Sequence, residues 1–74
     1  MEKKDVDLIQ ALLEREPDLR RYYDEHVDLE RQLARYQHKV HLSPEEEVER
    51  KRLQKLKLAG KDRIMEILSR HRSH

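Results

Sequence analysis

Apolar residues recur along two long stretches of the chain at steps of three and four, which is the spacing of one face of a helix. In the first stretch this stripe includes one histidine, and its members are Leu19, Tyr22, His26, Leu29, Leu33, Tyr36 and Val40. In the second stretch the stripe is less regular and consists of Val48, Leu53, Leu56, Gly60, Ile64 and Ile67. A stripe that keeps this step over about three heptads is typical of a coiled-coil helix.

Residues that interrupt helices are few, so they predict where the helices begin and end. Pro17 favours a new helix and a break at Glu16, because proline lacks a backbone N–H and pushes the preceding residue into an extended conformation. Ser43 and Glu46 lie on either side of Pro44 at the spacing of a capping box, which is a helix start signal. We therefore predict helices over residues 5–15, 17–41 and 44–70.

The predicted link between the two long helices, residues 41–43, is so short that these helices must run antiparallel. The two stripes then match along their lengths, with His26 opposite Gly60. The sequence thus predicts one domain over residues 1–74 and an all-α fold. Its expected architecture is an antiparallel two-helix hairpin, coiled-coil-like, with a short N-terminal helix.

The facing pair His26 and Gly60 has two interpretations. Glycine inside a helix costs about 1 kcal/mol relative to alanine, so a compensating contact is expected. In the structural interpretation, which we favour, the imidazole of His26 fills the space left by Gly60 and forms a local hydrogen bond. In the functional interpretation His26 binds a ligand or responds to pH, since histidine side chains ordinarily titrate between about pH 5 and 8.

Composition excludes several classes of protein. Of the 74 residues 45% are charged and 35% are hydrophobic, and there is no cysteine. The longest apolar runs, such as 11–13, are too short for a transmembrane helix or a signal-peptide core, and a disulfide scaffold is excluded. Because the apolar minority is concentrated on stripes, helices are favoured over a disordered chain. We expect a cytoplasmic protein.

Most of the chain, about residues 19–68, resembles a known family. The run Leu53-Gln-Lys-Leu-Lys-Leu-Ala-Gly-Lys-Asp-Arg-Ile64 is similar to the signature L-x-K-x-K-L-x-L-K-D-x-I of the small bacterial YdcH-like proteins, and His26 and Leu29 match an upstream H-x-x-L element. Two positions depart from the pattern: Gly60 stands where leucine is usual, and Leu56 where a polar residue is usual. The resemblance implies a helical hairpin in a bacterial cytosolic protein. Because the family is a domain of unknown function, the resemblance implies no chemistry.

A basic run overlaps the second stripe. Between residues 50 and 63 there are seven cationic residues and one acidic residue, Asp62. The cationic residues are Arg50, Lys51, Arg52, Lys55, Lys57, Lys61 and Arg63. Such a helix is typical of proteins that bind nucleic acid or an anionic surface. In helical projection, however, only Lys51 and Lys55 point straight away from the stripe, so the cations do not form one patch.

The facing part of the 17–41 helix is acidic, which gives the flanking lysines a structural role. By helical projection Glu25 and Glu30 flank the stripe, so Lys61 with Glu25 and Lys57 with Glu30 are the candidate cross-helix ion pairs. The sequence leaves open which flank of one helix meets which flank of the other. Exposed pairs of this kind contribute about 0.2–1 kcal/mol each and mainly fix the register of the helices.

Metal, cofactor and catalytic sites are not predicted. The histidine pairs His38 with His41 and His71 with His74 lie at opposite ends of the expected hairpin, whereas zinc needs three or four converging ligands. We interpret these histidines as solvated positions near helix ends. The carboxylates lie on a convex rod without a pocket, so we expect no metal, no cofactor and no enzymatic activity.

A two-helix hairpin buries a single seam, which is the contact between the two facing stripes. So small a core seldom contributes more than about 3–5 kcal/mol to stability. Additional stability can come from docking of residues 5–15 as a third helix, or from association of two hairpins into a four-helix bundle. Candidate interaction residues outside the seam are Val27, Leu58, Lys51, Lys55, Ile9 and Leu13. The sequence predicts a non-enzymatic interaction module that binds itself or another protein. The alternative is a small basic factor associated with nucleic acid or the ribosome.

Overall fold

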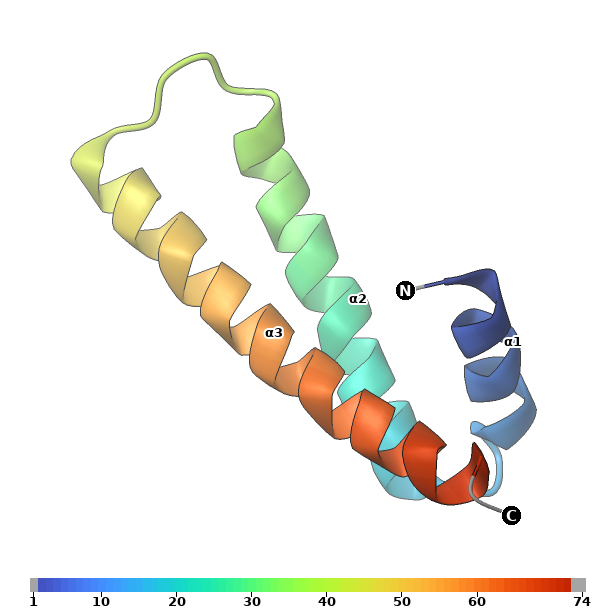
Figure 1. Ribbon diagram of the computed structural model, residues 1–74. Coiled ribbons are helices and arrows are strands. Elements are labelled where there is room, and N and C mark those ends of the chain that lie inside the picture. The colour runs from blue at the N-terminus through green and yellow to red at the C-terminus, as the bar shows by residue number, and fades with distance from the viewer. Residues whose placement is uncertain (1, 73–74) are drawn as a thin grey trace.

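The computed structural model describes residues 2–72, and that part of the chain contains three α-helices and no strand. Helix α1 spans Lys3–Leu12, α2 spans Pro17–Gln37 and α3 spans Pro44–Arg72. Helices α2 and α3 pack together and run in opposite directions, and α1 packs against α3 at the end far from the α2–α3 link (Figure 1). The molecule measures 47 × 18 × 18 Å and is therefore a rod. The predicted all-α class and short N-terminal helix are confirmed.

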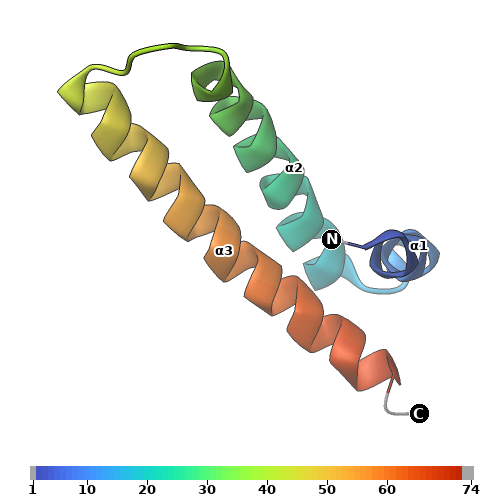
Figure 2. The same cartoon turned by 45° about the horizontal axis from the view of Figure 1, so that its top comes forward.

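The core lies at the end of the rod where the three helices meet. Its fully or almost fully buried side chains are Ile9, Leu12, Leu19, Ile64, Ile67 and Leu68. Partly buried side chains surround them, namely Leu8, Leu13, Tyr22, Tyr23 and Met65. Toward the link α2 and α3 diverge, as both views show (Figures 1 and 2). The packing is therefore tight at one end of the α2–α3 pair and open at the other.

Helix starts follow the predicted signals. Glu16 is extended, with φ −120° and ψ 91°, and Pro17 opens α2. At α3 the N–H of Glu46 donates to Ser43 Oγ at 3.1 Å, and the N–H of Ser43 donates to Glu46 Oε1 at 3.0 Å. This reciprocal pair is the capping box, and it satisfies two N–H groups that the helix start leaves without partners.

Helix ends were harder to predict. Helix α2 ends at Gln37 rather than at His41, because the diverging helices need a longer connection than three residues can provide. An ion pair between Lys39 and Glu46 holds this connection against the start of α3. Helix α1 occupies Lys3–Leu12 instead of residues 5–15, and α3 extends two residues past the predicted end at residue 70.

The predicted seam is correct along part of its length. Six of its residues are buried, namely Leu19, His26, Leu33, Leu53, Ile64 and Ile67. Four more are partly buried, namely Tyr22, Leu29, Tyr36 and Gly60.

Three seam predictions were wrong. Val40 is 90% exposed because it lies beyond the end of α2, and Val48 is 69% exposed because the helices diverge at that level. Leu56 is 45% exposed. At that turn of α3 the half-buried Lys57 lies toward α2, where its Nζ is 3.5 Å from Glu30 Oε1, so Leu56 lies on the flank of the contact.

Helix α1 docks on the α2–α3 pair instead of presenting a free surface. Ile9 is fully buried and Leu13 is half-buried against the core, so the proposal that they form an interaction surface is corrected. Asp5 forms an ion pair with Arg72, which joins the first turn of α1 to the last turn of α3. The Arg72 guanidinium lowers the pKa of the Asp5 carboxyl below its ordinary value. No helix in the described part of the chain has the length and apolarity needed to cross a membrane.

Candidate functional site

Large apolar side chains remain exposed outside the core. They are Val27, Val40, Val48, Leu56 and Leu58, of which Leu58 is 61% and Val27 is 36% exposed. Single exposed apolar residues are normal on a protein surface, but contiguous ones often mark a binding face. Some of these side chains line two grooves between α2 and α3.

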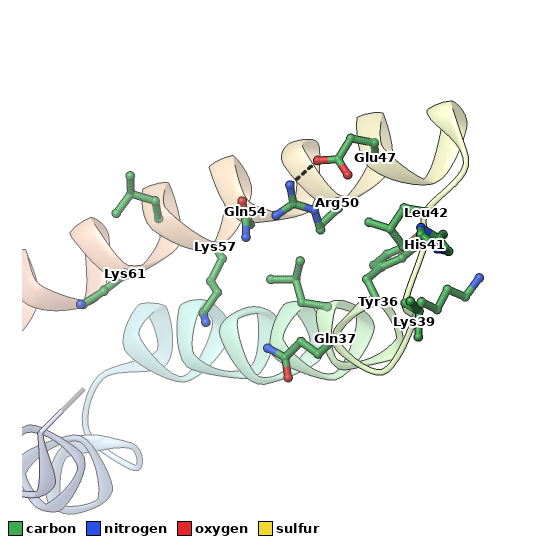
Figure 3. Close-up of a pocket in the computed structure, with 13 residues that line it drawn as sticks. Tyr36, Gln37, Lys39, His41, Leu42, Glu47, Arg50, Gln54, Lys57 and Lys61 are labelled. Carbon is green, nitrogen blue, oxygen red and sulfur yellow. Dashed lines mark hydrogen bonds and ion pairs between the residues drawn. The ribbon is translucent and has the colours of Figure 1, made fainter.

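The first groove lies where the helices diverge, and we call it the turn-end groove. It has a volume of about 750 Å³, and apolar side chains from both helices and the link line it, including Leu33, Tyr36, Leu42 and Leu58. Cations stand along the same groove, namely Lys39, Arg50, Lys57 and Lys61 (Figure 3).

Most of these cations already have acidic partners within the chain. Arg50 forms an ion pair with Glu47, as the dashed line in Figure 3 marks. Lys39 pairs with Glu46 at the link, and Lys57 pairs with Glu30. The guanidinium beside Glu47 lowers the pKa of that carboxyl, and Lys39 together with the Ser43 N–H does the same for the pKa of Glu46. Carboxylates of the same chain therefore neutralise most of the positive charge along the turn-end groove.

The second groove lies between α2 and α3 nearer the core, and we call it the glycine groove. Its volume is about 380 Å³, and its lining is mostly apolar, with Tyr22, Leu29, Leu56, Ala59 and Gly60. Charged residues also line it, with Glu25 and Asp28 on α2 and Arg63 on α3. Sequence reasoning missed this groove, although the adjacent small residues Ala59 and Gly60 beside Leu56 were a signal that could have found it.

Gly60 opens this groove because nothing fills the space beside it. A Cβ atom built on Gly60 would have no other heavy atom within 4 Å, apart from its own chain neighbours and helix backbone. The expectation that His26 fills this space was therefore wrong. The imidazole Nε2 instead lies 3.0 Å from Glu30 Oε1, one turn further along α2. The local polar partner of His26 is thus the carboxylate of Glu30, at ion-pair distance.

His26 is the one buried side chain of the described residues that keeps an unpartnered polar atom. Only 6% of the residue is exposed, and its Nδ1 has no hydrogen-bond partner. Because Glu30 Oε1 also lies 3.5 Å from Lys57 Nζ, the three side chains form one polar group across the seam.

The two expected cross-helix ion pairs have different outcomes. The pair of Lys57 with Glu30 is confirmed. The pair of Lys61 with Glu25 does not form, because Lys61 lines the turn-end groove whereas Glu25 lines the glycine groove. These two side chains leave their helices on different sides of the seam.

The basic run on α3 is partly neutralised. Arg52 Nε donates to Glu49 Oε2 at 3.0 Å, and its guanidinium lowers the pKa of Glu49. Lys51 and Lys55 are exposed, and within residues 2–72 neither has a carboxylate at ion-pair distance. The outward orientation predicted for these two lysines is confirmed.

The described residues contain no group of three or more His, Asp or Glu side chains that could hold a metal ion. His38 and His41 are exposed as expected. His71 is not simply solvated, since its Nε2 lies 2.9 Å from Glu16 Oε1 and so ties the end of α3 to the α1–α2 connection. His74 lies outside the described residues.

No protein-family model, curated protein or solved structure matches the chain. The resemblance to the YdcH-like family, carried by the run 53–64, accordingly stays a prediction.

Proposed function

We propose that the chain is a non-enzymatic protein-interaction module that self-associates into a helical bundle in the cytoplasm. The observation that carries this proposal is the exposure of large apolar side chains along a rod that keeps its own core at one end. These side chains are Val27, Val40, Val48, Leu56 and Leu58. Part of the same proposal is that α2 and α3 act as an antiparallel coiled-coil-like hairpin.

The magnitudes favour association. Fully burying a leucine or valine side chain contributes about 1.5–3 kcal/mol. A domain of this size seldom draws more than about 3–5 kcal/mol from its own core. Covering two or three apolar side chains of this size with a second copy would thus add stabilisation comparable to that of the isolated fold. Self-association is also a common way for a small helical hairpin to complete its core.

Thermal unfolding at several protein concentrations tests this proposal. If the native chain associates and the unfolded chain does not, mass action raises the midpoint temperature with concentration. We expect such a rise for the natural sequence, and a lower, concentration-independent midpoint for the double variant Leu56→Lys, Leu58→Lys. The matched control is Lys51→Ala with Lys55→Ala, on the outward face of the same helix. A midpoint that stays constant with concentration in the natural sequence would contradict the proposal.

The exposed, unpaired Lys51 and Lys55 favour one second candidate, a small factor that binds nucleic acid or the ribosome. Binding driven by phosphates weakens steeply between about 50 and 200 mM salt, because bound cations are released from the polyanion. We expect such binding, if it is the function, to be lost in Lys51→Glu, Lys55→Glu. RNA or DNA retention that survives this double change and high salt would contradict the second candidate.

A further inference from the structure

The glycine groove has the shape of a helix-docking surface. Ala59 and Gly60 form a strip of α3 without large side chains, and the position where a Cβ of Gly60 would stand is open to 4 Å. Small residues at a contact allow two helices to approach closely. Leu29 and Leu56 border this strip and remain partly or largely accessible. Apolar side chains of an incoming helix pair can therefore enter the groove and contact these leucines.

The charges beside the groove are of opposite sign on its two walls. Glu25 and Asp28 stand on the α2 wall, and Arg63 stands on the α3 wall. Within the described chain none of the three forms an ion pair, and Asp28 only accepts a hydrogen bond from Gln32 at 2.8 Å. The cations of the turn-end groove, in contrast, mostly have partners within the chain. The glycine groove thus offers one acidic and one basic edge to a partner.

A surface with one acidic and one basic edge is complementary to a second copy of itself in only one of two simple arrangements. A two-fold axis parallel to the rod places α2 of one copy over α3 of the other, so that the acidic edge meets the basic edge. A two-fold axis across the rod places α2 over α2, and the carboxylates then face each other. Like charges across an interface are unfavourable, so charge selects the first arrangement.

We propose that the glycine groove is the self-association face and that a second copy of the chain occupies it, with α2 of each copy lying against α3 of the other. This inference rests on the proposed function, self-association, and specifies its surface. In the assembly Glu25 and Asp28 of each copy lie beside Arg63 of the other, and every neighbouring pair of helices runs antiparallel, as in an up-down four-helix bundle. No lining residue of the groove belongs to α1, so α1 stays docked on its own chain.

Charge reversal with mixing tests the arrangement. The variant Arg63→Glu has acid on both edges, and the variant Glu25→Lys, Asp28→Lys has base on both edges. We expect each to associate with itself at least about tenfold more weakly than the natural chain. Mixed in equal amounts, the two variants should form heteromeric complexes with near-natural affinity. Native mass spectrometry measures the proportion of heteromeric complexes by their mass. The matched control is Lys51→Glu, Lys55→Glu, whose self-association should not change in buffer of physiological salt.

A second variant checks the shape of the groove without changing charge. Gly60→Leu places a side chain in open space, so we expect the variant to stay helical by circular dichroism and to associate at least about tenfold more weakly. If the natural chain associates but neither charge reversal nor Gly60→Leu weakens it, this face is wrong while the proposed function stands. If the two reversed variants fail to complement each other, the arrangement is wrong. A natural chain that stays monomeric overturns both.

Discussion

Replacing His26 with leucine should stabilise the protein, although the change removes the contact of its Nε2 with Glu30. Only 6% of His26 is exposed, and its Nδ1 has no partner among the described residues. A buried polar group without a partner costs about 1–3 kcal/mol, whereas a typical hydrogen bond contributes a net stabilisation of only about 0.5–1.5 kcal/mol. After the change Glu30 keeps Lys57 and its contact with water, because half of its side chain is exposed. The balance favours His26→Leu by about 1 kcal/mol.

Urea unfolding followed by far-ultraviolet circular dichroism measures this difference. For a chain of this size the dependence of the unfolding free energy on urea is about 1 kcal/mol per molar, so the midpoint should rise by about 1 M. Both proteins must be compared at the same concentration, since association adds to apparent stability. The control is His41→Leu at an exposed position, which should change the unfolding free energy by no more than about 0.5 kcal/mol. If His26→Leu lowers the unfolding free energy by about 1 kcal/mol or more, the cost of the unpartnered Nδ1 does not outweigh the contact of Nε2 with Glu30.

Three further changes test the packing, the groove and the α1–α3 ion pair. Ile9→Ala removes a fully buried side chain that α1 places in the core, so it should lower the unfolding free energy by about 2–5 kcal/mol. Chemical denaturation measures this loss, which should leave little of the variant folded even without denaturant. Gly60→Ala should raise the unfolding free energy by about 1 kcal/mol, because alanine favours the helix and its Cβ meets no neighbouring atom. Arg72 lowers the pKa of Asp5 in the folded state, so this pair stabilises the protein above the ordinary Asp pKa and loses its effect as pH falls through the lowered value. Thermal midpoints measured from neutral to acidic pH should therefore show the natural chain above Asp5→Asn at neutral pH, with the difference closing at acidic pH; a constant difference would contradict this reasoning.

Features that depend on residues close together in the chain could be predicted from the sequence. The break before Pro17 and the capping box of Ser43 and Glu46 form as expected, because each depends on residues within one turn of a helix. The buried part of the stripe was also readable, since helical periodicity decides which face of a helix is apolar. The ion pair of Lys57 with Glu30 followed from the same projection.

Features that depend on how two helices diverge were not readable. Periodicity assigns Val40 and Val48 to the apolar face but does not say where that face loses its partner, so both were wrongly placed in the seam. The rotation of α3 decides that Lys57, and not Leu56, lies toward α2. The same rotation opens the groove beside Gly60. The sequence had predicted that the imidazole of His26 fills this space.

Sedimentation equilibrium of the natural chain over a wide concentration range is the most direct test of the central claim that this rod completes its apolar surface with a second copy. We expect the average mass to rise from the 9.1 kDa of one chain toward a defined multiple, and the rise to persist at high salt because apolar burial drives it. A mass that stays at 9.1 kDa up to the highest soluble concentration would contradict the account.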